Sequence, residues 1–341
     1  DANVGGNQDV AGDSSIHGSQ SVDKDQTIGG DQTVTGHQTV GNGQDITGEQ
    51  NVTGDQTIGG NQNVAGDSAI HGSQTIDKDL TVTGDANVGG NQDVAGDSAI
   101  HGNQSVDKDQ NVGGDQTITG HQTVGNGQDI TGDQHVTGDQ IIGGNQDVAG
   151  DSSIHGSQTI DKDLTVTGDA NVGGSLDVAG GSTFHGDVDV EGTLSVDGLD
   201  IEGDQTIGGH LTVNDGQTVN GQQTVNGSSH VTGNQVIDKN LTVNGNTYTK
   251  GNETVGGDQL IEGNSSIYGS QQIGKDQTVH GNQTIDKDQI IKGDSSIYGS
   301  QHINGSQIVD GTSYLHDTNV DGNLDVTGSA HVDKDLVVDG N

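Results

Sequence analysis

The chain contains no cysteine, proline, methionine, tryptophan or arginine, and aromatic residues make up only 1% of it. The lack of cysteine excludes a disulfide framework and a thiolate metal site. With 26% hydrophobic residues, a chain of 341 residues is too polar for an ordinary globular core. No apolar run approaches the roughly 18 residues of a membrane-spanning helix, and no signal peptide is visible. We therefore expect no membrane insertion.

The charged residues are predominantly acidic. All ten basic residues are lysines, against 50 acidic residues, which gives a net charge of −40. This charge repels nucleic acid and anionic lipid, so neither is an expected partner. Low hydrophobicity with high net charge is typical of disordered chains, unless the apolar residues follow a pattern. The sequence starts at Asp1 and stops at Asn341 in mid-repeat, as expected for a segment of a longer protein.

Such a pattern is present, because an aliphatic residue recurs at every sixth position. The series begins with the predicted core residues Val4, Val10, Ile16, Val22, Ile28, Val34 and Val40. It runs to Val196, slips by one residue to resume at Ile201, and slips again to resume at Val320 and end at Val338. Thr249 is its one exception. A disordered chain has no reason to keep this phase, so we expect stacked repeats that contact only their neighbours.

Counted from the aliphatic residue, the hexad has the consensus V-x-G-[DN]-Q-T. A helix would place residues six apart about 240° around its axis and form no stripe. A strand fits, since positions five, six and one alternate inward, outward and inward. Glycine at position three predicts a turn with positive φ. The predicted turn residues are Gly6, Gly12, Gly18, Gly30 and Gly36.

These features predict an all-β hexapeptide-repeat β-helix or β-solenoid rod. Glutamine at position five faces inward, where stacked carboxamides bond to one another as a ladder. The narrow, polar core favours an interwound homotrimeric prism of about 270 Å, with a single-chain solenoid as the alternative. A three-sided single-chain coil predicts about 90 Å, and a two-sided coil of twelve residues about 140 Å.

The two slips divide the chain into segments 1–200, 201–319 and 320–341, which we interpret as one architecture with local irregularities. A longer duplication is superimposed, since the sequence that begins at Asp1 recurs from Asp85. The stretch from Val243 to Val255, which contains Thr249, is the predicted position of a kink.

The repeat resembles two families. Lys239-Asn-Leu-Thr-Val and Gly322-Asn-Leu-Asp-Val resemble the Gly-Asn-Leu-Thr-Val repeats of phage tail-fibre shafts, and V-x-G units resemble contractile-injection spikes. The hexad is similar, more distantly, to the hexapeptide β-solenoids. The first resemblance implies a trimeric shaft with a receptor-binding or membrane-piercing tip.

Candidate sites are few. The histidines at position two are expected to face solvent singly: His17, His71, His101, His155 and His185. Stacked carboxylates at position four repel one another unless cations lie between layers. Diffuse counterions are expected to neutralise these carboxylates. Ordered calcium is the alternative, with Asp13, Asp25, Asp31, Asp55 and Asp67 as its candidate ligands. No catalytic residue, metal or cofactor is predicted.

We therefore expect a structural protein rather than an enzyme. The predicted function is a rigid, acidic fibre shaft, exposed outside a cell or on a virion, that carries an adhesive or receptor-binding tip outside this segment. The alternative is a single-chain solenoid that polymerises end to end into a surface or matrix filament, or belongs to a long adhesin. The expected partners are copies of the chain itself and its tip or anchor domains.

Overall fold

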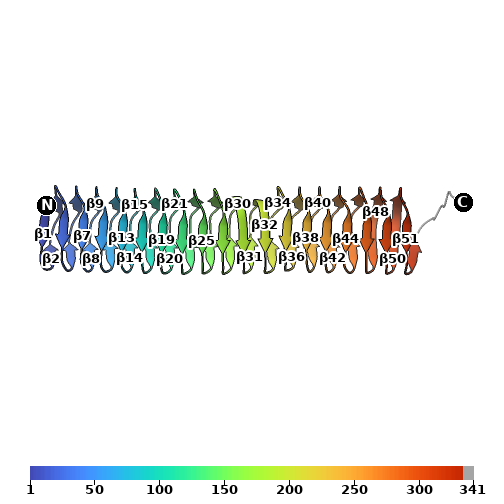
Figure 1. Cartoon of the computed structure of the whole chain (residues 1–341), viewed down its shortest axis with the longest axis horizontal. Helices are drawn as coiled ribbons and strands as arrows, with labels where there is room; N and C mark the ends of the chain where they lie inside the picture. The colour runs from blue at the N-terminus through green and yellow to red at the C-terminus, as the bar shows by residue number, and fades with distance from the viewer. Residues whose placement is uncertain (333–341) are drawn as a thin grey trace. The chain divides into compact units, whose positions relative to one another are not determined.

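The chain is all-β. A computed structural model describes residues 1–332, which contain no helix. They belong to two compact units, Asp1–Gly174 and Ser175–Asn341, and in each unit short parallel strands wind into a single-chain β-solenoid (Figure 1). The expected all-β solenoid fold is confirmed. Residues 333–341, which include Val338 and the end of segment 320–341, lie outside the described residues.

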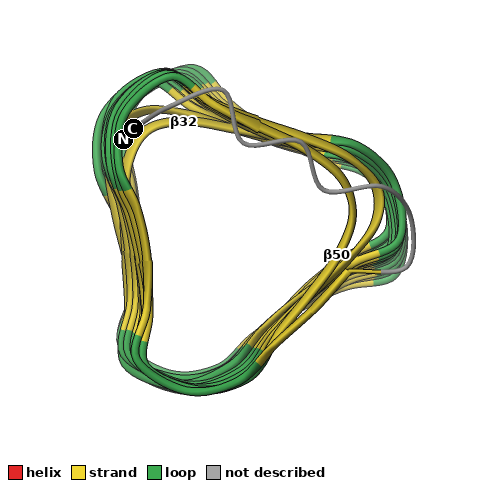
Figure 2. Cartoon of the chain, turned by 90° about the vertical axis from the view of Figure 1, so that its right-hand side faces the viewer, coloured by secondary structure: helices red, strands yellow, loops and turns green. Residues whose placement is uncertain are grey.

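The first unit consists of three-residue strands that begin every six residues. They run at this spacing from β1 (Ala2–Val4) and β2 (Gln8–Val10) to β29 (Ala170–Val172). Strand β1 pairs in parallel with β4 (Gln20–Val22), and Ala2 lies beside Gln20. Partners are 18 residues apart here and throughout the unit. One coil is therefore three hexads, and seen end-on it is triangular (Figure 2).

The triangular coil decides between the two single-chain geometries considered from the sequence. The two-sided coil of twelve residues is wrong, because the pairing step is 18 residues. The duplicated sequence therefore does not stack on itself. Asn3 of β1 and its duplicate Asn87 of β15 (Ala86–Val88) are 84 residues apart, which is not a multiple of 18. Duplicated residues consequently lie on different sides of the coil.

The second unit has the same coil with two local exceptions. Four of its strands are long because they run through a corner: β30 (Leu176–Phe184), β32 (Leu194–Ile201), β48 (Ser295–Ile303) and β50 (Ser313–Val320). The others have three residues: β31 (Val188–Val190), β33 (Gln205–Ile207) and then every six residues to β47 (Gln289–Ile291), followed by β49 (Gln307–Val309), β51 (Leu324–Val326) and β52 (Ala330–Val332).

The long strands mark the places where the hexad count slips. Val178 pairs with Val196 at a step of 18, but Gly181 pairs with Gly198 at a step of 17. Strands β48 and β50 repeat this shift between Ile297 and Ser300. The corner that lacks one residue is drawn out into continuous strand, and β32 and β50 visibly cut inside the triangle (Figure 2). Pairing therefore continues on both sides of each slip.

Positions five and one of each hexad line the interior of the coil. Val22, Ile28, Val34 and Val40 are buried. Val4, Val10 and Ile16 are half-buried, since only one neighbouring coil covers the first coil. Each fully buried aliphatic side chain contributes about 1.5–3 kcal/mol to folding. The predicted kink is wrong, because Thr249 is buried in the unbroken register of β40 (Thr247–Thr249).

The glycines at position three are explained by close packing of corners. No glycine in residues 1–332 has a positive φ, so the predicted left-handed turn is wrong. A Cβ on Gly66 would instead lie 2.7 Å from the carbonyl oxygen of Gly48 in the preceding coil and 2.9 Å from the Glu49 nitrogen. Successive corners therefore approach too closely for a side chain. Gly12, at the same corner in the first coil, meets nothing within 4 Å.

Strand pairing closes each coil within one chain. The hydrogen bonds between coils, such as Gly48 N to Gly30 O at 3.1 Å, continue through the corners. A coil of the described residues thus needs no second chain to complete its sheets. The interwound homotrimer remains a prediction about assembly.

Candidate functional site

Position four forms a column of hydrogen-bond acceptors at each corner. The carboxylate of Asp31 accepts a bond from the Glu49 backbone nitrogen at 2.9 Å, and Asp13 accepts one from Asp31 at 3.0 Å. This N–H points away from the strand ladder and would otherwise lack a protein partner. Asparagine, serine and histidine serve equally, as when the Nδ1 atom of His37 accepts from Asp55 at 2.9 Å. The sequence signal was the preference of position four for aspartate, asparagine and serine, whose short side chains carry an acceptor.

The calcium candidates are part of these columns. Asp13, Asp31 and Asp67 share one corner, whereas Asp25 and Asp55 lie at the other two. One oxygen of each carboxylate accepts a backbone N–H from the next coil, at 2.8–3.2 Å. In residues 1–332, no three His, Asp or Glu side chains gather in a metal-binding group. Diffuse counterions remain the expectation, with ordered calcium as the alternative.

The five position-two histidines are all exposed: His17, His71, His101, His155 and His185. Sequence spacing did not predict one contact, in which His155 packs edge-on against His135 with ring centroids 4.8 Å apart. The contact arises because His135 and His155 stand on neighbouring coils, in β23 (Gln134–Val136) and after β26 (Ser152–Ile154). The pairing step of 18, which only the fold reveals, was the missing information.

The predicted glutamine ladder fills the interior and is confirmed. Gln122 donates from Nε2 to the Oε1 atoms of Gln104 and Gln110 at 3.0 and 2.9 Å. Its own Oε1 accepts from Gln140 at 2.7 Å. Gln122 also donates to Gln116 on the third side at 3.1 Å, so glutamines from all three sides of the coil satisfy one another in the interior. Burial of so many amides is tolerated because nearly every one is bonded.

Where the ladder is interrupted, polar atoms remain unpartnered. Ten buried side-chain atoms in residues 1–332 have no protein partner, and every one belongs to position five: in Ser98, Ser182, Gln205, Ser229, Thr247, Glu253, Ser265, Ser295, Gln307 and Ser313. Ser229, Thr247 and Ser265 stack on successive coils. Each such atom lowers the stability of the folded chain, because a buried polar group without a hydrogen bond has lost its contacts with water.

Glu253 is the one carboxyl inside the ladder. Its Oε1 accepts bonds from Gln259 at 2.5 Å and Gln271 at 2.8 Å, while Oε2 has no partner. Complete burial raises the pKa of Glu253, and the two glutamine bonds oppose this only in part. The group is therefore biased towards the neutral acid.

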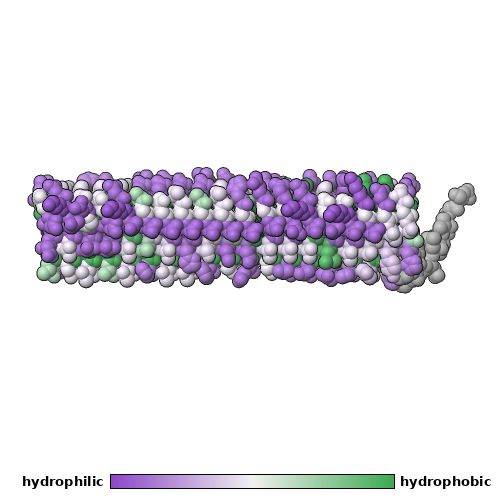
Figure 3. Space-filling view, turned by 90° about the horizontal axis from the view of Figure 1, so that it is seen from below, coloured by the Kyte–Doolittle hydropathy of each residue, from purple (hydrophilic) through white to green (hydrophobic). Residues whose placement is uncertain are grey.

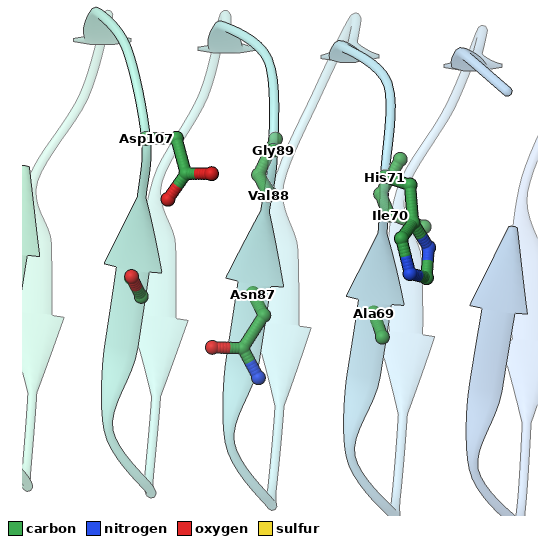
Figure 4. A pocket seen from close by; sticks show the side chains of 8 residues that line it. Ala69, Ile70, His71, Asn87, Val88, Gly89 and Asp107 are labelled. Atoms are coloured by element: carbon green, nitrogen blue, oxygen red, sulfur yellow. The ribbon is translucent and has the colours of Figure 1, made fainter. Parts of the chain in front are cut away.

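The outer surface of residues 1–332 has open hollows. One hollow of about 310 Å³ lies over Ala69, Asn87 and Ser105, which are small outward residues on successive coils (Figure 4). His71 and Asp107 flank it, but they stand two coils apart, about 10 Å. The hollow thus brings together serine, histidine and aspartate without the hydrogen bonds of a catalytic triad.

A second hollow, of about 400 Å³, is acidic. It lies over Asp129 and Asp147, which face outward on adjacent coils. Partial burial and the negative charges of Asp147 and Asp109 raise the pKa of Asp129. The face drawn in Figure 3 is mainly hydrophilic, with small hydrophobic patches.

No protein-family model, curated protein or solved structure matches this chain. The resemblance to phage tail-fibre shafts and hexapeptide solenoids consequently rests on the repeat pattern alone. Within residues 1–332, no helix is long and apolar enough to cross a membrane.

Proposed function

We propose that the chain is a structural fibre shaft. It would act as a rigid, acidic spacer outside a cell or on a virion and carry an adhesive or receptor-binding tip beyond this segment. The observation that supports this most is the pairing pattern, in which each coil bonds only to the coils before and after it. Such a design lengthens by about 4.8 Å with each added coil and needs no change in the coil itself.

The closed coil favours a single chain as the unit of this shaft. Its strands and ladder find their partners within one chain, so an interwound homotrimer would have to exchange contacts that are already satisfied. The homotrimer is the alternative assembly. End-to-end stacking of solenoids into a surface or matrix filament, or into a long adhesin, is the alternative use of the same unit.

Light scattering of the isolated chain separates these assemblies. A single-chain shaft has a mass of 34.6 kDa, and an interwound trimer has three times that mass at every concentration. An end-to-end filament would instead grow in mass with concentration. A stable trimer would overturn the single-chain proposal and leave the shaft function standing.

The location is tested separately. An antibody raised against the chain is expected to label intact source cells or virions. Labelling that requires permeabilised cells would contradict an extracellular or virion shaft.

A further inference from the structure

Four aromatic rings lie in a row on successive coils of the second unit. His280 follows β45 (Gln277–Val279), and Tyr298, Tyr314 and His331 lie in β48, β50 and β52. Neighbouring ring centroids are 5.1, 6.3 and 5.4 Å apart. We call these four residues the aromatic row. The first two pairs are tilted by 59° and 44°, and Tyr314 and His331 are stacked at 18°, so the rings form a continuous column along the stacking direction of the coils.

The fold does not require these rings. The outward neighbours of Tyr314 on the preceding coils are Ser296 and Thr278, so small hydroxyl residues suffice at this position. The first unit forms the same coil without any tyrosine. Tyr298 nevertheless leaves 56% of its surface exposed. Large exposed apolar groups that serve no packing role indicate a contact surface.

The β48–β50 register shift lies beside the row. Tyr298 occupies position two. In a regular coil this position comes just after the three-residue strand, at the start of the corner, but Tyr298 lies inside the continuous strand β48. Tyr314 occupies position six of the next coil. The shift therefore accompanies a place where rings from two different hexad positions meet at 6.3 Å.

The polar groups around the row restrict the ligand. The Nδ1 atom of His280 bonds to Glu262 Oε2 at 2.6 Å, so this carboxylate already has a partner. Tyrosine, serine, threonine and histidine both donate and accept hydrogen bonds, as sugar hydroxyls do. A cation would require unengaged acceptors, and an anion is repelled by a chain of net charge −40 that has no arginine. A neutral polyhydroxyl ligand fits both constraints.

We propose that the aromatic row binds a neutral, linear carbohydrate. The apolar face of a sugar ring would pack against the exposed ring of Tyr298, which Tyr314 flanks at 6.3 Å, while its hydroxyls bond to hydroxyl side chains beside the row, such as Ser296. This goes beyond the shaft function, because it makes the side of the second unit adhesive in its own right. The shaft proposal stands whether or not the row binds sugar.

The test uses the whole chain on an array of neutral and acidic oligosaccharides, followed by calorimetric titration of those that bind. We expect binding to neutral glycans that changes little between about 0.05 and 0.5 M NaCl, since no charge pairing is involved. Tyr298→Thr and Tyr314→Thr are each expected to weaken it at least tenfold. Tyr298→Phe, which keeps the ring, is expected to retain most of the affinity.

Ile141→Thr is the matched control. It removes an exposed apolar side chain from the first unit, where Thr123 and Thr159 already stand on either side, and should leave binding unchanged. Circular dichroism and the melting temperature verify that each variant folds. The proposal is overturned if no neutral glycan binds, if only charged probes bind, or if the Tyr298→Thr/Tyr314→Thr double variant binds as tightly as the parent.

Discussion

At the scale of single residues, an acceptor side chain at position four bonds to the backbone at the corners of the coil. The carboxylate of Asp31 satisfies the Glu49 N–H, and serine or histidine at position four does the same elsewhere. Acidic residues at this position therefore have a structural reason that does not involve metal. The large negative charge of the chain follows in part from this use of aspartate as a corner acceptor.

The corner glycines give the first testable prediction. Gly66→Ala should lower the free energy of unfolding by about 1–3 kcal/mol, because its Cβ would lie 2.7 Å from Gly48 O. Gly12→Ala at the same corner has open space and should be neutral or stabilising by up to about 1 kcal/mol. Chemical denaturation measures both. Equal losses in the two variants would instead indicate that glycine is needed for its backbone conformation.

Glu253 predicts a pH dependence of stability. Burial raises its pKa in the folded chain, so the folded state holds this proton more tightly than the unfolded state. The stabilisation is fully present below the ordinary glutamate pKa and is lost as pH rises towards the raised value. Glu253→Gln should therefore increase the unfolding free energy at pH 7 by about 1–3 kcal/mol and flatten this dependence.

Denaturation curves at several pH values check this prediction. The exposed Glu191→Gln variant controls for the change in net charge and should shift stability by less than about 0.5 kcal/mol. If Glu253→Gln showed no gain at pH 7, the carboxyl would have to be stabilised in its ionised form.

At the scale of elements, each three-residue strand turns the side chains of positions five and one towards the interior, most often a glutamine and an aliphatic residue. Gln122, in β21 (Gln122–Val124), bonds to glutamines on three sides of the coil. Leucine also occurs at position five, where it offers no hydrogen bond to the polar residue of the next coil. Leu80 is followed in its column by Ser98, whose hydroxyl has no protein partner.

Gln122→Leu should accordingly destabilise the chain by about 1–3 kcal/mol, because neighbouring carboxamides lose a partner in a buried setting. Thr123→Ala on the outer face of the same strand should change stability by less than about 0.5 kcal/mol. Thermal and denaturant unfolding compare the two variants. Similar effects would mean that the ladder adds no more than outward side chains do.

At the scale of the whole molecule, the coil is the unit that can be added or removed. Deletion of residues 92–109 removes one coil of 18 residues and brings β19 (Gln110–Val112) to the place of β16 (Gln92–Val94). We expect this variant to fold, with strand content preserved and stability only modestly reduced, since each coil contacts only its neighbours.

Deletion of residues 92–106 is the control. It removes a number of residues that is not a multiple of six, so corner residues would fall at strand positions and the inward pattern would be broken. Circular dichroism and cooperative unfolding should distinguish the two deletions. If both deletions behaved alike, the stability of the units would not depend on hexad phase.

The repeat was sufficient to predict the strands, the buried aliphatic series and the inward glutamines, because a period of six with strict inward and outward alternation suits only a corner-forming strand. It was also sufficient to locate both slips. The role of glycine was predicted wrongly, because the hexad shows that a side chain is excluded at position three but not what excludes it. The kink at Thr249 was wrong because a buried hydroxyl can bond to Gln235 at 3.2 Å.

The sequence alone determined which positions of a hexad form the strand, which point inward and which form the corner, since these depend on local backbone geometry and on burial. The tertiary structure decided how many hexads make a coil, and with it every contact between residues 18 apart. Three hexads per coil bring together the rings of the aromatic row and the acceptors at the corners. The same number places the carboxyl of Glu253 beside its glutamine partners. The physical reason is that the hydrogen bonds between coils, and not those within a hexad, select which residues become neighbours.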